Sequence, residues 1–273
     1  MSFDKLIHCV LWIVAILIAV IPVFMLFELL VSGADYLSIR FLLEEPRQSG
    51  REGGIYPSII STLLILLVCL SVVIPLGLVC ALFLNETLNQ SSRFIATLNY
   101  CLDVLAAVPS IIYGLFGYIF FTELLGMGFS ILSGGLSLAC MVLPLFVRMA
   151  QLALSHSPEK YRQAAYALNI SHPGFVWRIL LPSAASGIAA AVIIATGRAL
   201  AETAVLIFTA GYVLRVPESL LDSGRSLSVH VYDMAMNVPG GTGIASATAL
   251  VLIALLVVIN VAAKSIGHYW LKR

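Results

Sequence analysis

The chain has 273 residues, of which 60% are hydrophobic and 11% are charged, with a formal net charge of +1 at pH 7 and a mean hydropathy of +1.03. Soluble domains carry roughly 25% charged residues. The composition therefore excludes an ordinary soluble protein and indicates an integral membrane protein.

Apolar runs of membrane-spanning length occur six times along the chain. A bilayer core of about 30 Å requires roughly 20 apolar residues in a helix. The runs cover residues 6–31, 56–84, 95–121, 129–154, 184–212 and 244–263. The first run is long and lacks a small-residue cleavage site, so we interpret it as a retained helix rather than a signal peptide. The sequence predicts an all-α, polytopic membrane protein, with residues 1–273 forming a single domain of six transmembrane helices.

Prolines and glycines interrupt several of these predicted helices. Pro75 with Gly77, and Pro109 in the third run, remove a backbone donor or a side chain, so we expect bends and close helix packing there. Ser110 and Tyr113 add hydroxyl groups to the third run. These hydroxyls fit a path in which an oxyanion loses its water, and they fit ordinary interhelical hydrogen bonds equally well.

A polar loop at residues 155–182 separates the fourth and fifth runs. Residues 159–168 are rich in helix formers, with Ser157 and Pro158 in front as cap and first-turn residues. Asn169 tolerates the left-handed conformation that ends many helices. The loop therefore predicts a short helix lying across the membrane surface.

The predicted surface helix carries small and bulky side chains that suit contact with another protein. We expect its alanines to form a face that a partner approaches closely, and its aromatic and leucine side chains to act as anchors. The residues concerned are Ala164, Ala165 and Ala167, with Tyr161, Tyr166 and Leu168. The alternative is an ordinary interfacial helix whose basic side chains reach towards lipid headgroups.

Two charged residues, Arg198 and Glu202, lie four positions apart in the fifth apolar run and would share one face of a continuous helix. A charge at mid-membrane costs about 2.5–3.5 kcal/mol on insertion scales, so such residues normally face a bundle interior or an aqueous path. The planar guanidinium of Arg198 suits an anion path because it donates two parallel hydrogen bonds to an oxyanion. Glu202 would position or gate that anion. The alternative is a structural ion pair.

The remaining polar residues indicate no disulfides, no metal or cofactor site and no nucleotide-binding loop. The five cysteines lie in or beside predicted helices, which implies no disulfide framework, and the five histidines are scattered, as solvated or interfacial side chains would be. We therefore predict no metal and no cofactor. The sequence has no phosphate-binding G-x4-G-K-[ST] loop. Asp103 is expected to be solvated or paired with Arg93 or Arg148.

Positive residues indicate the orientation, since they collect on the cytoplasmic side of membrane proteins. With both termini inside, nine Lys and Arg residues lie on the cytoplasmic side and five lie outside. This places the 155–182 loop in the cytoplasm. The segments 32–55 and 213–243 then lie outside, where either could receive a soluble solute-binding protein or form an amphipathic, lipid-facing piece.

The order of residues in the polar loop resembles the EAA loop of ABC importer permeases, a family in which this loop docks into the ATP-hydrolysing subunit. The matching positions are Ala164, Ala165, Ile179, Leu181 and Pro182, while Gln163 stands where an acid is usual and Asn169 where glycine is usual. The resemblance assigns ATPase coupling to Tyr161, Gln163, Ala164, Ala165, Leu168 and Asn169. It implies that a partner subunit, and not this chain, hydrolyses ATP.

Two further segments are similar to the permease subunits of phosphate ABC importers. Residues 198–210 read RALAETAVLIFTA and residues 109–117 read PSIIYGLFG. Ala201 and Val205 replace the Gly and Pro usual there, so we expect a straighter fifth helix. The resemblance covers a core of residues 54–263 and implies the ABC importer permease (MetI-like) fold in a prokaryotic inner membrane. It assigns the substrate path to Arg198, Glu202, Ser110 and Tyr113.

The resemblance also implies partners: a homologous second permease, two ATP-binding subunits, an external phosphate-binding protein and the lipid bilayer, with no nucleic acid. Sulfate or molybdate remains an alternative substrate because these oxyanions share charge and shape with phosphate. A secondary carrier in which Glu202 relays protons is a further alternative, but it leaves the 164–182 spacing unexplained. We find no nucleophile and base pair to support a membrane-embedded enzyme.

Overall fold

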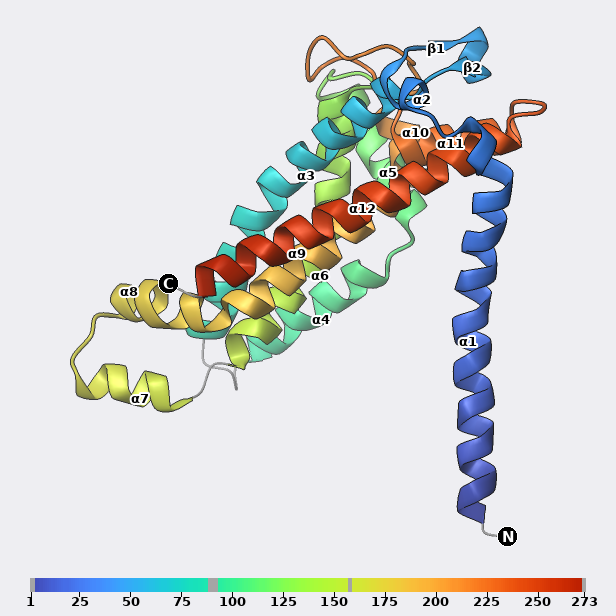
Figure 1. The fold of residues 1–273 in the computed structure, drawn as a ribbon. Helices are drawn as coiled ribbons and strands as arrows, with labels where there is room; N and C mark the ends of the chain where they lie inside the picture. Colours follow the sequence, from blue (N-terminus) through green and yellow to red (C-terminus); the bar gives the residue numbers. More distant parts are fainter. Residues whose placement is uncertain (1–2, 88–92, 157–158, 272–273) are drawn as a thin grey trace.

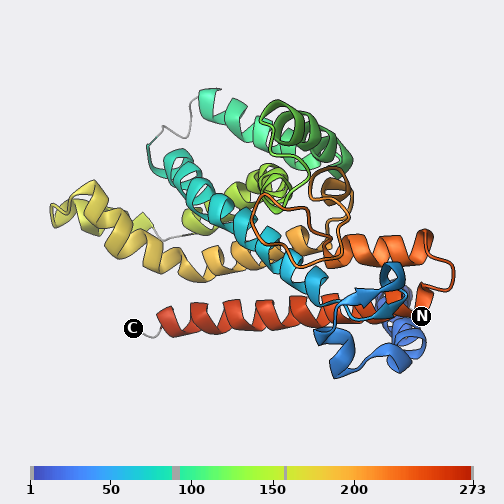
Figure 2. The same ribbon diagram turned by 90° about the horizontal axis from the view of Figure 1, so that it is seen from above.

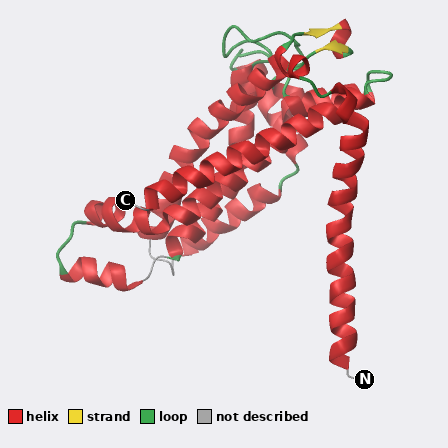
Figure 3. Cartoon of the chain, viewed as in Figure 1, coloured by secondary structure: helices red, strands yellow, loops and turns green. Residues whose placement is uncertain are grey.

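The computed structural model describes residues 3–87, 93–156 and 159–271, which are helical apart from loops and one short hairpin (Figure 3). The long helices are α1 (Phe3–Gly33), α3 (Tyr56–Leu82), α4 (Arg93–Ala107), α6 (Ile131–Ser155), α9 (Leu181–Ala201) and α12 (Thr242–Leu271). The shorter ones are α2 (Ile39–Leu43), α5 (Ser110–Gly117), α7 (Glu159–Ala167), α8 (His172–Phe175), α10 (Ala204–Thr209) and α11 (Leu227–Met236). The strands β1 (Pro46–Arg47) and β2 (Glu52–Gly53) pair antiparallel.

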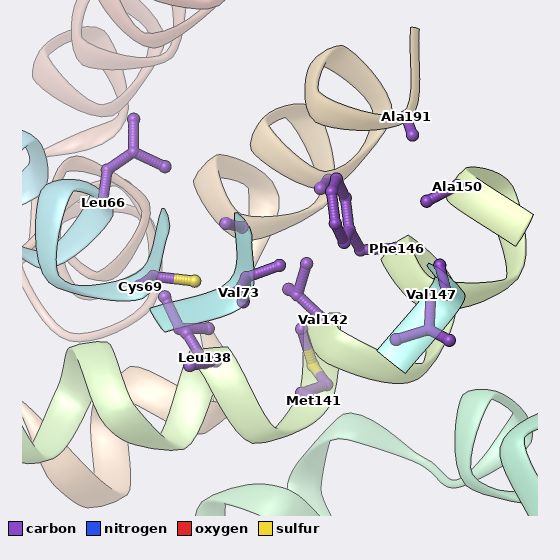
Figure 4. Close-up of a cluster of buried hydrophobic side chains, with 14 of the residues drawn as sticks. Leu66, Cys69, Val73, Leu138, Met141, Val142, Phe146, Val147, Ala150 and Ala191 are labelled. Carbon is purple, nitrogen blue, oxygen red and sulfur yellow. The ribbon is translucent and has the colours of Figure 1, made fainter. Parts of the chain in front are cut away.

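The core of the bundle lies where α3 and α9 both pack against α6 (Figure 4). Cys69, Val73, Val142 and Phe146 are almost completely buried there. Lipid offers no hydrophobic gain to helix association, so close packing between small residues must hold the helices together. Gly77 shows this, because a Cβ at that position would lie 2.4 Å from Cδ1 of Phe146. The expected close packing at Gly77 is confirmed.

Helix α1 stands away from the bundle and contacts it only near its end, where α12 begins (Figure 1). At that contact a Cβ on Gly33 would lie 2.7 Å from the backbone nitrogen of Ala247. Residues 7–32 of the helix are almost entirely apolar and, apart from half-buried Leu29, exposed. Its surface is therefore available to lipid or to another subunit.

The third predicted helix, over residues 95–121, is bent at Pro109 as expected, and the bend is sharp enough to divide it into two helices. It consists of α4 and α5 followed by a π-helical turn at Tyr118–Leu124, with a bend of 92° between the two helices. Pro109 causes the break because it lacks a backbone N–H and disfavours helical geometry at the preceding residue. Among the described residues, five helices are long and apolar enough to cross a bilayer, and counting the bent pair as one span gives six.

The fifth predicted helix is also broken, which corrects the expectation of a straighter helix over residues 184–212. Helix α9 ends at Ala201, and Glu202 follows in an extended conformation with φ −76° and ψ 129°. The short α10 then packs against α5 and α6. Replacing the usual Gly and Pro with Ala201 and Val205 therefore does not restore a continuous helix.

The segment 213–243 was expected to lie outside as a docking site or an amphipathic, lipid-facing piece, but residues 224–230 and the rest of α11 are part of the folded bundle. Helix α11 packs against α12 and α3 (Figure 2), and Val229 and Met234 are fully buried. His230 is 1% exposed, which corrects the expectation of solvated or interfacial histidines for this residue. The α2 helix and the β1–β2 hairpin lie at the same end of the bundle (Figure 1).

Candidate functional site

Helix α7 lies with α8 at the opposite end of the bundle from the β1–β2 hairpin (Figure 1). The predicted cap residues Ser157 and Pro158 lie outside the described residues. At the other end of α7, Asn169 has a positive φ of 50°, which confirms the predicted left-handed stop. Its N–H donates to the Tyr166 carbonyl at 3.1 Å, and the Ile170 N–H donates to the Ala165 carbonyl at 2.9 Å. These two bonds form a Schellman motif, a role in which asparagine replaces glycine.

The predicted coupling residues do not share one face of α7. Ala165 is 4% exposed and turns towards the bundle, so the proposed face of small residues does not include it. Tyr161, Ala164 and Leu168 are exposed and lie at positions i, i+3 and i+7, which places them along one stripe of the helix. We call these three residues the α7 stripe. Gln163 is exposed outside the stripe.

A buried carboxylate that sequence reasoning missed anchors the α7–α8 segment. Glu86 lies in a π-helical turn at Phe83–Thr87 that extends α3, and 2% of its side chain is exposed. Arg162 of α7 donates to its Oε1 at 2.6 Å, and Asn85 donates to the same oxygen at 2.9 Å. His172 of α8 brings Nε2 within 3.7 Å of Oε2. An acidic residue just after the second apolar run was the only signal in the sequence.

The α7–α8 segment continues directly into the helix that carries Arg198. Helix α8 passes through a π-helical turn at Val176–Leu180 into α9 without an intervening loop. Arg162 also lies over the ring of Phe175 in α8, with 5.7 Å between its guanidinium carbon and the ring centroid. Helix α8 and the Arg198 region therefore lie at opposite ends of one nearly continuous helical rod over residues 172–201.

Arg198 lies in the last turn of α9, and Glu202 follows the end of that helix. The separation between Arg198 Nη2 and Glu202 Oε1 is 4.0 Å, a loose ion pair with no hydrogen bond between the two side chains in the described structure. The Arg198 side chain is 37% exposed and the Glu202 side chain 15%. A positive residue also suits the partial negative charge of a helix C-terminus. The arrangement leaves hydrogen-bond donors of the guanidinium for another acceptor.

The break after α9 is supported by polar residues that sequence reasoning also missed. The Ser228 hydroxyl of α11 donates to the Glu202 carbonyl at 2.7 Å. The neighbouring Leu227 N–H donates to the Thr62 hydroxyl of α3 at 2.8 Å. The Ser228 bond satisfies a carbonyl that the end of α9 would leave unpaired, and the Thr62 bond satisfies an N–H in the first turn of α11. Isolated Ser and Thr residues in apolar runs gave no indication of this role.

Tyr113, assigned to the substrate path, makes a backbone contact in this structure. Its hydroxyl donates to the Leu105 carbonyl at 2.9 Å. In an unbroken helix that carbonyl would accept from residue 109, which is a proline without an N–H. Tyr113 therefore stabilises the α4–α5 bend. Ser110 lies three residues earlier, in the first turn of α5, and is half-buried.

Two further charged groups hold helices together. Arg148 of α6 forms a bidentate ion pair with Asp103 of α4, with N–O distances of 2.7 and 2.8 Å. This is one of the two pairings expected for Asp103.

At the hairpin end of the bundle, buried Arg225 forms an ion pair with Asp233 of α11 at 2.9 Å. Burial, assisted by the charge of Arg225, lowers the pKa of His230 to about 4, against the opposing effect of Asp233. The imidazole of His230 is therefore uncharged at physiological pH.

Comparison with known proteins identifies the family. Residues 73–269 match the family described as "Binding-protein-dependent transport system inner membrane component". The chain is 30% identical over 281 residues to the "Probable ABC transporter permease protein YqgI" of Bacillus subtilis, covering 97% of this chain and 95% of that protein. It is 30% identical over 227 residues to the "Phosphate transport system permease protein PstA" of Mycobacterium leprae, covering 81% and 74%.

The fold is similar to that of a chain in the crystal structure of a bacterial alginate ABC transporter bound to its periplasmic protein. The TM-score is 0.69 at 14% identity, with 98% of this chain and 96% of that chain covered. The predicted all-α ABC importer permease fold is thereby confirmed. The chain belongs to the family of binding-protein-dependent transport system inner membrane components, the permease subunits of ABC importers.

Proposed function

We propose that this chain is the permease subunit of an ATP-driven phosphate importer. The observation that carries the proposal is Arg198, a guanidinium at the end of a membrane-spanning helix whose ion pair with Glu202 is loose. Similarity to phosphate transport permeases supports phosphate as the anion. Residues 1–273 form one transmembrane permease domain with a core at 54–263, and ATP is hydrolysed by a partner.

The geometry around Arg198 suits transient anion binding. A guanidinium offers two parallel donors to a tetrahedral oxyanion, and an acceptor already 4.0 Å away competes weakly for them. When the anion leaves, Glu202 neutralises the charge that would otherwise be unpaired. Binding that is too tight would stop release, so a competing carboxylate assists transport. Ser110 and Tyr113 lie beside this path, with Tyr113 positioning it through the α4–α5 bend.

The partners follow from the same proposal. A homologous second permease completes the path, two ATP-binding subunits dock on the cytoplasmic side, and an external phosphate-binding protein delivers the anion. The α7 stripe, with Gln163 and Asn169 beside it, provides the docking surface for one ATP-binding subunit. The unburied apolar surface of α1 contacts lipid or the second permease.

The chain lies in the inner membrane of a prokaryote with both termini and α7 in the cytoplasm. A cysteine introduced by Lys160→Cys should therefore resist a membrane-impermeant maleimide added outside intact cells, and react once the membrane is opened. An exposed external position, Arg215→Cys, provides the matched control. Labelling at residue 160 from outside would overturn the orientation.

Uptake by the complete transporter tests the substrate. We expect labelled phosphate to accumulate in cells that lack other phosphate carriers, and excess sulfate or molybdate to leave that uptake unchanged. Competition by either oxyanion, or uptake of labelled sulfate in place of phosphate, would contradict the proposal that phosphate is the substrate. ATP-independent uptake driven by a proton gradient would instead identify a secondary carrier.

A further inference from the structure

The buried carboxylate of Glu86 occupies a special position between the coupling segment and the bundle. It belongs to the extension of α3, yet it contacts Arg162 of α7 and faces His172 of α8. Carboxylates are seldom fully buried unless paired. The Arg162 ion pair at 2.6 Å is therefore a strong connection between α3 and the surface helix.

The second oxygen of this carboxylate is buried and has no hydrogen-bond partner in the described structure. His172 Nε2 lies 3.7 Å from it, beyond hydrogen-bond distance. A small movement of α8 towards α3 would bring these two atoms together. The carboxylate is therefore bonded to α7 through one oxygen, while its other oxygen faces α8 without a hydrogen bond in the described structure.

Two helical rods lead from this contact to the Arg198 region. Along one, α8 continues into α9 and carries Arg198. Along the other, α3 carries Thr62, which accepts from Leu227 beside the serine that holds the Glu202 carbonyl. Each rod spans about 25 residues, or roughly 37 Å at the helical rise. Arg198 moves with α9, whereas the Glu202 carbonyl is held by Ser228 beside the contact with α3. A sliding of α9 against α3 would therefore act on the turn that joins Arg198 to Glu202.

We propose that Glu86 is a positioning residue that links ATPase-driven movement of α7 to both rods, and thereby sets the gap between Arg198 and Glu202. Its side chain ties α7 to α3 at the coupling end, while α8 ties α7 to α9. Without the Glu86 tie, movement of α7 still reaches α9 through α8 but no longer reaches α3, so the two rods lose their fixed relation at the anion path. The proposal rests on the proposed function of α7 as the docking helix.

The test uses the complete transporter, with its binding protein, in proteoliposomes. Glu86→Gln keeps the side-chain volume but removes the charge, and Arg162→Gln breaks the same pair from the surface helix, where loss of the bundle fold is not at stake. We expect both variants to retain the ATP-binding subunits and basal hydrolysis. Solute transported per ATP, and stimulation of hydrolysis by the binding protein, should fall about tenfold, a typical size for coupling between sites.

The matched control is Asp103→Asn, which breaks the bidentate ion pair between α4 and α6 without touching α7 or α8. This control should leave the solute transported per ATP, and the stimulation of hydrolysis by the binding protein, close to wild type. The reversed pair, Glu86→Arg with Arg162→Glu, should recover at least part of the coupling, which a purely structural role for the carboxylate volume would not predict.

Several outcomes would overturn the role of Glu86. These are unchanged ratios in both single variants, an equal loss in Asp103→Asn, or loss of the ATP-binding subunits from both single variants, which would make the contact one of docking. Failure of the substrate proposal gives a different result. In that case the wild-type complex shows stimulated hydrolysis without phosphate uptake, and the stimulation ratio still tests Glu86.

Discussion

Replacing Arg198 with glutamine should reduce phosphate uptake to background while the chain still inserts and assembles with its partners. A neutral amide lacks the charge-assisted donors that an oxyanion requires. Truncating one partner of a charged, hydrogen-bonded pair costs roughly 2–5 kcal/mol, and the partial exposure of Arg198 places the loss near the lower end, a reduction of about 30-fold or more. Initial uptake rates of labelled phosphate provide the measurement.

Three companion variants separate an anion site from a structural ion pair. Arg198→Lys keeps the charge but loses the planar fork, so partial uptake at best is expected. Arg215→Gln removes an exposed arginine paired with Asp222 at 3.6 Å and should leave uptake unchanged. The double variant Arg198→Gln with Glu202→Gln leaves no unpaired charge, so it should assemble but not transport. Near-normal uptake by the double variant would show that the Arg198–Glu202 pair has only a structural role.

The sequence predicted the features that depend on neighbouring residues, such as helix propensity, helix ends and proline bends. The short surface helix follows from helix formers, and its end follows from the tolerance of Asn169 for positive φ. The pairing of Asp103 with Arg148 was one of two partners that the charge pattern allowed. Pro109 was expected to bend its helix, but a single sequence does not give the size of the bend.

The parts that escaped prediction depend on contacts between distant segments. Glu202 ends α9 because Ser228, from another helix, satisfies its carbonyl, and nothing within residues 198–210 indicates that contact. Glu86 was overlooked because its partners lie on α7 and α8, which are brought to it only by folding. Ala164 and Ala165 are identical in type, and only packing decides that one is exposed and the other buried.

That difference between two neighbouring alanines gives the second large prediction. Ala164→Arg places a long charged side chain in the middle of the α7 stripe, and arginine is a good helix former, so α7 should persist. The ATP-binding subunit then meets a buried, unpaired charge at the centre of its interface, where a few residues carry most of the binding energy. We expect the amount of ATP-binding subunit that co-purifies with the tagged chain to fall at least about tenfold, since one such charge costs several kcal/mol.

The two control variants make this result specific to the α7 stripe. Ser155→Arg adds the same side chain at an exposed position at the end of α6, outside α7, and should leave co-purification intact. Ala165→Arg forces a charge into a site that is 4% exposed, so it should detach α7 from α8 and increase proteolysis of the 155–182 loop. Ala164→Arg should not increase that proteolysis. Wild-type recovery of the ATP-binding subunit with Ala164→Arg would place the docking surface elsewhere.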